Sequence, residues 1–172
     1  MKICLMIVVA AALAGNSWAL DRCSVVRAIR RGGLAGIKGY SLGDFVCLAY
    51  HASRYDTSLH RSPTEYGIFQ INSYWWCDDG KTPGRKNVCR IPCRNLLNTN
   101  IADDVKCVKR IVSDPNGLAA WEPWKEYCRG QALSSFVEEC PTGSAESSSC
   151  FPFFSLCPGL LMPSLALVKL SL

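Results

Sequence analysis

The sequence predicts an α+β domain that is braced by disulfides, and three features of the chain support this. Residues 41–53 carry apolar side chains at three- and four-residue steps, and Ser41 is a good helix N-cap. Residues 64–76 alternate in the manner of a strand and end in two adjacent tryptophans. Eight cysteines lie between Cys23 and Cys140. We therefore expect a helix and a strand held face to face by the rest of the chain.

Residues 1–19 are typical of a secretory signal peptide. Lys2 precedes the apolar run 3–14, and residues 17–19 form a small-x-small cleavage pattern. The apolar run is shorter than the roughly 20 residues that span a bilayer. We expect cleavage after Ala19 and secretion, into an environment where cysteines form bridges. Eight cysteines allow 105 pairings, so their spacing alone does not choose one.

Length and charge narrow the class of protein. A chain of 172 residues has room for one modest domain with a real core. Its 19 Lys and Arg against 14 Asp and Glu give a net charge of +5, which favours anionic surfaces such as bacterial walls. No basic run is interleaved with aromatic residues, so we expect no nucleic-acid binding. We expect a monomer.

Three further helices are predicted. The first covers 22–31 and is ended by a pair of glycines. The second covers 102–113, where Ile, Val and acidic residues give an apolar stripe and a negative first turn. The third covers roughly 118–127 and contains Pro123, which clashes with the preceding turn of a helix. We expect either a kink there or a helix that effectively begins near Trp121.

The central motifs of the chain closely resemble those of the animal (chicken-type, C-type) lysozyme and α-lactalbumin family, glycoside hydrolase family 22. The motifs are Gly39-Tyr-Ser-Leu-Gly43, Tyr66-Gly-Ile-Phe-Gln-Ile-Asn-Ser73 and Trp75-Trp-Cys77. The resemblance covers residues 20–140 and implies a lysozyme-like α+β fold, with a helical lobe, a small antiparallel sheet lobe and four disulfides. The implied pairs are Cys23–Cys140, Cys47–Cys128, Cys77–Cys93 and Cys89–Cys107.

The resemblance also implies a sugar-cleaving site that this chain keeps only in part. Family members cut β-1,4-linked amino sugars with an acid five residues after the helix cysteine and an aspartate just before the Tyr-Gly of the strand; lysozyme is the type case of this chemistry. Here those positions are Ala52 and Glu65. A methyl group cannot donate a proton, and losing a general acid costs about 10²- to 10⁴-fold in rate. Glu65 is either a vestigial second carboxylate or a solvated strand residue.

The positions that bind sugar in the family are better kept. They are Gln70, Asn72, Trp75, Trp76, Asp114, Ala120 and Trp121. Of the paired tryptophans, we expect one to line the cleft and one to lie in the core, and Trp124 to be core; Trp121 is either a cleft residue or core. Between Thr57 and Thr64 the chain is shorter than in typical members, which alters one wall of the cleft.

Part of the pattern is closer to α-lactalbumin, which has no hydrolase activity and modifies the sugar specificity of a galactosyltransferase. Residues 50–57 and 64–67 carry this similarity, and His51 matches a histidine of the partner-binding edge. Ser135 and Phe136 stand in place of a Gln-Trp pair of that edge. The tyrosine that blocks the groove in α-lactalbumin is replaced here by Ala120, so we expect an open groove.

The loop 94–104 resembles the calcium loop of α-lactalbumin and the calcium-binding lysozymes. The matching ligands are the carbonyls of Asn95 and Asn100 and the side chains of Asn98, Asp103 and Asp104. One of the usual three carboxylates is an amide here, and calcium affinity falls with ligand charge. The alternative is that the two aspartates only oppose a helix dipole.

Residues 141–172 lie outside the family pattern. Residues 143–149 have the composition of a linker, and 151–172 are largely apolar but contain three prolines, which argue against a continuous spanning helix. The segment loosely suggests a lipid-anchor signal, and an alternative transcript end is the other explanation. Cys150 and Cys157 either pair with each other or stay unpaired, and we expect the segment to be poorly ordered.

These observations predict a secreted lysozyme-like protein that binds N-acetylglucosamine-containing glycans or bacterial peptidoglycan, with hydrolysis weak or absent. Residual muramidase activity, and hence an antibacterial role, is one alternative. A modifier of a glycosyltransferase is another. By analogy with sperm lysozyme-like proteins of the family that have lost catalytic carboxylates, gamete-surface glycans are a further candidate partner.

Overall fold

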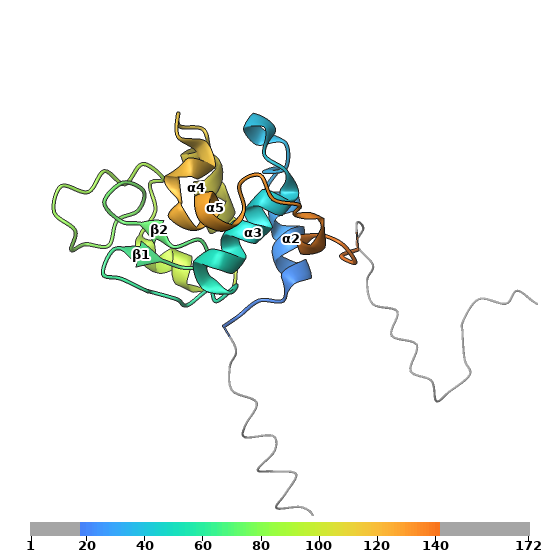
Figure 1. Ribbon diagram of the computed structural model, residues 1–172. Helices are drawn as coiled ribbons and strands as arrows, with labels where there is room; N and C mark the ends of the chain where they lie inside the picture. Colours follow the sequence, from blue (N-terminus) through green and yellow to red (C-terminus); the bar gives the residue numbers. More distant parts are fainter. Residues whose placement is uncertain (1–17, 142–172) are drawn as a thin grey trace, which may run out of the picture. The chain divides into compact units, whose positions relative to one another are not determined.

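The computed structural model describes residues 18–141, which form one unit with the element order expected of an α+β fold (Figure 1). Residues 142–172 of the predicted tail, with Cys150 and Cys157, and residues 1–17 of the predicted signal peptide lie outside the described residues. The α-helices are α2 (Arg22–Arg31), α3 (Leu42–Ser53), α4 (Ala102–Val112) and α5 (Glu122–Tyr127), and the strands are β1 (Glu65–Tyr66) and β2 (Ile71–Asn72). Short 3-10 helices cover Ile37–Gly39, Cys93–Leu97, Gly117–Ala120 and Ser134–Phe136.

Helix α3 is the central element, and it begins where the sequence predicts. Ser41 Oγ accepts a hydrogen bond from the Asp44 amide at 3.2 Å, and Asp44 Oδ2 accepts one from the Ser41 amide at 2.8 Å. This reciprocal capping box satisfies donors that a helix start otherwise leaves unpaired. Four apolar side chains of α3 are fully buried: Phe45, Val46, Leu48 and Ala49. The helix packs against both α2 and α5, and Figure 1 shows it between α2 and the strands.

Helices α2 and α4 confirm the predicted amphipathic patterns. The stripe of α4 is buried along its whole length, as are the three inward residues of α2. The buried residues are Val25, Val26 and Ile29 in α2, and Ile101, Val105, Val108 and Val112 at α4. Gly33, at φ +63°, follows the end of α2 and turns the chain away.

The segment predicted as 118–127 is two helices. A 3-10 turn covers Gly117–Ala120, and Trp121 adopts an extended conformation (φ −110°, ψ 119°) before α5 starts at Glu122. Pro123 then occupies the first turn of α5, where no amide hydrogen is needed. The second of the two sequence expectations, a helix that effectively begins near Trp121, is therefore confirmed.

The prediction of one strand over residues 64–76 is wrong, because the chain reverses within it. β1 and β2 pair antiparallel, with Glu65 opposite Asn72 and Tyr66 opposite Ile71. Gly67 (φ +74°) and Gln70 (φ +50°) form the turn between them, closed by a 3.0 Å bond from the Gln70 amide to the Gly67 carbonyl. Alternating side chains are equally compatible with one long strand and with two short ones.

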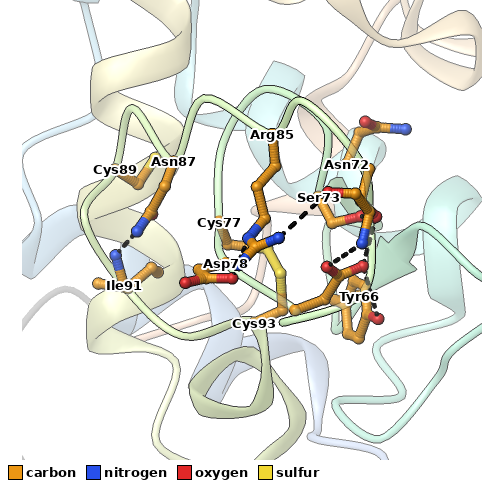
Figure 2. Close-up of a disulfide and its surroundings, with 12 residues drawn as sticks. Tyr66, Asn72, Ser73, Cys77, Asp78, Arg85, Asn87, Cys89, Ile91 and Cys93 are labelled. Carbon is orange, nitrogen blue, oxygen red and sulfur yellow. Dashed lines mark hydrogen bonds and ion pairs between the residues drawn. A yellow bond between two sulfur atoms is a disulfide. The ribbon is translucent and has the colours of Figure 1, made fainter.

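All four predicted disulfides are present. Cys23–Cys140 joins the start of α2 to the end of the domain, Cys47–Cys128 joins α3 to the end of α5, and Cys77–Cys93 and Cys89–Cys107 brace the central region. Figure 2 shows Cys77–Cys93 closing the loop that follows β2, where Arg85 pairs with Asp78. Such bridges typically stabilise a small domain by about 2–4 kcal/mol each.

Candidate functional site

A cleft of about 580 Å³ is the candidate site. Its lining comes from the end of α3, the hairpin β1–β2, the tryptophans after β2, the end of α4, and the start of α5. The structure brings together here every residue that the sequence suggested for catalysis or sugar binding. They are Ala52, Glu65, Gln70, Asn72, Trp75, Trp76, Asp114, Ala120 and Trp121.

The tryptophans of the cleft differ in how firmly they are held. Trp75 is 51% exposed, whereas Trp76 is half-buried against the core, so the exposed indole and the core-packed indole both line the cleft. Trp121 is buried and its Nε1 donates to the Phe69 carbonyl at 2.8 Å. Trp124 lies outside the cleft lining and is core, as expected, with its Nε1 bonded to Asp44 Oδ1 at 3.0 Å. An exposed aromatic face is thus available to stack on a sugar ring.

Several polar groups of the cleft are already engaged within the protein. Gln70 Nε2 donates to the carbonyls of Leu59 (2.8 Å) and Gly67 (2.7 Å), and its Oε1 accepts from the Arg61 amide at 3.3 Å. The buried amide of Gln70 therefore holds the loop before β1. Asn72 Oδ1 accepts from the Tyr74 amide at 2.9 Å. Both side chains shape the cleft walls.

No carboxyl group replaces the absent acid on α3. Ala52 is 1% exposed and contributes only a methyl group to the cleft. His51 is turned to another face of the helix, where it stacks on Tyr127 with 4.4 Å between ring centroids. Burial lowers the pKa of His51. It does not line the cleft.

The cleft does contain three carboxylates from other elements. Asp114 pairs with Arg110 at 2.6 Å, and Glu122 pairs with Lys125. Glu65, on β1, has no ion-pair partner within 4.0 Å among residues 18–141. Glu65 is thus the carboxylate of the cleft that is free to interact with positive charge on a ligand.

Sequence reasoning missed Arg61, which also lines the cleft. Its Nη2 donates to the Ala52 carbonyl at 2.5 Å, so a guanidinium group lies beside the backbone at the end of α3. Arg61 belongs to the shortened segment between Thr57 and Thr64, which has no periodic pattern. The only signal in the sequence was that shortening, which indicated an altered wall but not which side chain would form it.

The predicted calcium loop contains one feature that fits a cation. Asp104 is fully buried and neither of its carboxyl oxygens has a hydrogen-bond partner. Burial, together with the charge of Asp103, raises the pKa of Asp104 to about 9. A buried carboxyl group without a partner is costly, and a bound cation removes that cost. The helix-dipole explanation accounts for Asp103 but not for a carboxyl group that is shielded from solvent.

The remaining expected ligands of this loop interact with one another. Asn98 Nδ2 donates to the Asn95 carbonyl at 2.6 Å, and Asn98 Oδ1 accepts from the Asn100 amide at 2.8 Å. Among residues 18–141 there is no cluster of three or more His, Cys, Asp or Glu side chains suited to a metal. The oxygens that the resemblance implies as ligands would be two adjacent carboxyl groups plus amide and carbonyl oxygens, the ligand type that Ca²⁺ takes.

Fold and cleft together define a class of protein: a disulfide-bonded α+β domain whose helices and β-hairpin enclose an aromatic-lined groove. The chain belongs to the C-type lysozyme/α-lactalbumin family, whose model matches residues 18–140. Within residues 18–141, none of the helices combines the length and the apolar character needed to cross a membrane.

Similar proteins are lysozymes of type C. Lysozyme C of Bufo gargarizans andrewsi is 51% identical over 125 residues, which cover 70% of this chain and 86% of that protein. The kidney isozyme of lysozyme C from Ovis aries is 48% identical over 126 residues (70% and 96%). Lysozyme C of Pelodiscus sinensis is 47% identical over 125 residues (70% and 95%). The chain is thus lysozyme-like across its described domain.

Proposed function

We propose that this protein is secreted and binds β-1,4-linked N-acetylglucosamine oligosaccharides or peptidoglycan, with little or no hydrolysis. The observation that carries this proposal is a cleft that is lined by tryptophans and has alanine at residue 52, where the family resemblance implies the general acid. The similarity to lysozymes of type C supports the class of ligand.

The chemistry of glycoside cleavage explains why binding and turnover separate here. The leaving oxygen needs a proton from a group within hydrogen-bond reach, and a second carboxylate stabilises or attacks the oxocarbenium-like centre. Glu65 can serve only the second of these purposes. Stacking on Trp75 and Trp76 needs neither group, because it buries the apolar faces of the sugar rings.

Titration with chitotetraose is expected to change tryptophan fluorescence without release of new reducing ends. Trp75→Ala is expected to weaken binding about tenfold or more, because burying an aromatic side chain is worth about 1.5–3 kcal/mol. Tyr127→Ala is the matched control, since Tyr127 is 48% exposed and lies outside the cleft lining. Equal losses in the two variants would contradict the assignment of the cleft. Clearing of a bacterial cell-wall suspension within tenfold of the rate of a lysozyme C would establish the muramidase alternative instead.

A second candidate function is modification of a galactosyltransferase. His51 stacks on Tyr127 and lies 6.3 Å, between ring centroids, from Phe136, so the residues matching the α-lactalbumin partner edge form one aromatic surface. This surface is separate from the cleft lining. This candidate function requires that the protein lower the glucose concentration needed by the galactosyltransferase. An unchanged glucose requirement at a saturating concentration of the protein would exclude this function.

We also propose that Asp103 and Asp104, together with Asn95, Asn98 and Asn100, hold Ca²⁺. Adding 1 mM Ca²⁺ to EDTA-treated protein is expected to stabilise it by about 1–3 kcal/mol, because a ligand that binds only the folded state shifts unfolding by mass action. Asp104→Asn is expected to abolish this response and to leave the calcium-free protein at least as stable as before, since it removes an unpartnered buried carboxyl group. Thermal melts of both proteins and of the control Glu126→Gln, an exposed carboxylate outside the loop, test this. An unchanged calcium response in Asp104→Asn would refute the site.

A further inference from the structure

Arg61 places a positive charge in the cleft beside the backbone of Ala52. Its Nη2 donates to the carbonyl of Ala52 at 2.5 Å, and its side chain lines the same cleft as Trp75 and Glu65. The guanidinium has further N–H donors beyond the one that this bond uses. These donors belong to an exposed residue and are available to a ligand.

The loop that carries Arg61 is fixed by buried hydrogen bonds. Gln70 is 7% exposed; its Oε1 accepts from the Arg61 amide at 3.3 Å and its Nε2 donates to the Leu59 carbonyl at 2.8 Å. The Gly67 amide donates to the same Leu59 carbonyl at 2.9 Å. Arg61 is therefore attached to the hairpin at its backbone and to α3 at its side chain.

The charge of Arg61 is not neutralised within the described part of the chain. Of the cleft carboxylates, Asp114 is paired with Arg110 and Glu122 with Lys125. Neither Glu65 nor any other carboxylate of residues 18–141 lies within 4.0 Å of the Arg61 guanidinium nitrogens. A cleft with alanine at residue 52 and an unpaired guanidinium beside it favours a ligand with negative charge at that point.

We propose that Arg61 makes the cleft select acidic saccharides: β-1,4-linked amino-sugar chains that carry a carboxylate or sulfate on the unit beside Ala52. The inference rests on the proposed function, since it names the class of glycan for the same cleft. Planar guanidinium groups bind carboxylate and sulfate through paired N–H donors, and such charge-assisted bonds are stronger than neutral ones.

A purely structural role for Arg61 is the alternative. The Ala52 carbonyl belongs to the last turn of α3, where helix carbonyls lack intrahelical donors and a cation opposes the helix dipole. That role predicts a loss of stability when Arg61 is replaced, but no change in which saccharide is preferred. The two roles are therefore separated by measuring preference rather than affinity alone.

The test compares three oligosaccharides of equal length by calorimetry: chitotetraose, its 6-carboxylated derivative and its 6-O-sulfated derivative. At low ionic strength we expect at least one acidic form to bind about tenfold more tightly than chitotetraose, and this advantage to shrink at about 0.5 M salt. A preference for only one acidic form identifies which anion the cleft takes. Equal affinity for all three saccharides, or tighter binding of chitotetraose, overturns the inference while the proposed function stands. Absence of binding to all three overturns both.

Arg61→Met keeps an unbranched side chain and removes the charge. We expect the ratio of acidic to neutral affinity to fall toward one in this variant and to be largely kept in Arg61→Lys. Arg129→Met removes the same charge from an exposed residue outside the cleft lining, and its ratio should match the original protein. Should Arg61→Met fold poorly, the ratio of acidic to neutral affinity is measured in Arg61→Gln instead. The salt dependence of that ratio in the original protein is a second test of the charge. An unchanged ratio in a folded Arg61 variant would assign Arg61 to capping of α3 alone.

Discussion

Replacing Ala52 with glutamate and Arg61 with methionine together is expected to raise glycan hydrolysis by at least about 100-fold over the original protein. The first change supplies a proton donor on α3 at the edge of the cleft, and a positioned general acid contributes about 10²- to 10⁴-fold. Glu65 already provides a carboxylate on β1. Ala52→Glu alone is expected to do much less, because the Arg61 guanidinium beside it would lower the pKa of the new carboxyl group and keep it ionised.

Release of reducing ends from chitohexaose measures this gain, with the pH profile of the rate as a second readout. The matched control is the double variant with Ala52→Gln and Arg61→Met, which has the same shape but no acidic proton. Comparable activity in the glutamine and glutamate variants would show that the missing proton donor is not what limits this protein. A further change, Glu65→Asp, restores the usual residue of the family at the second position.

Replacing Gly67 with alanine is expected to destabilise the domain by at least about 3 kcal/mol. Gly67 has φ +74°, and a Cβ atom there would lie 2.0 Å from the backbone carbonyl oxygen of Leu96. Left-handed strain costs about 1–2 kcal/mol for an ordinary residue, and relieving such a backbone clash requires the hairpin to move away from its support. Since the hairpin carries Glu65 and Asn72, glycan binding should weaken as well.

Urea unfolding with the disulfides intact measures the loss. Gly80→Ala is the control, because Gly80 has nearly the same conformation (φ +73°) and a Cβ atom at that position would have no neighbouring atom within 4 Å. Its cost should be the backbone strain alone, about 1–2 kcal/mol. Equal losses in the two variants would mean that the close approach of Leu96 to the hairpin does not support the cleft.

Local patterns were sufficient for the helices. Ser41 and Asp44 can satisfy each other's backbone groups only at a helix start, so the beginning of α3 was readable without any tertiary information. Pro123 likewise restricted where α5 could begin, because proline is tolerated in the first turn and not later. The resemblance implied an antiparallel sheet, but the reversal within residues 64–76 was missed, since alternation of side chains does not reveal that Gly67 and Gln70 turn the chain.

The disulfide pairing came from family resemblance rather than from spacing, and the structure confirms it. The same resemblance placed Gln70 among the residues that bind sugar. In the structure both ends of its amide are used to hold the loop before β1. The type of residue at a family position does not reveal whether its side chain hydrogen-bonds a ligand or another part of the protein.

The sequence alone determined that this chain carries a disulfide-bonded lysozyme-type domain with alanine at position 52, because caps, apolar periodicity and motif residues are local features. Tertiary structure alone decided what stands beside that alanine. The Arg61 guanidinium bonds the Ala52 carbonyl while the Arg61 amide bonds Gln70. Asp104 likewise becomes an unpartnered buried carboxyl group only when α4 packs into the folded domain. Charge placement in a cleft depends on contacts between distant segments, and no local pattern encodes those contacts.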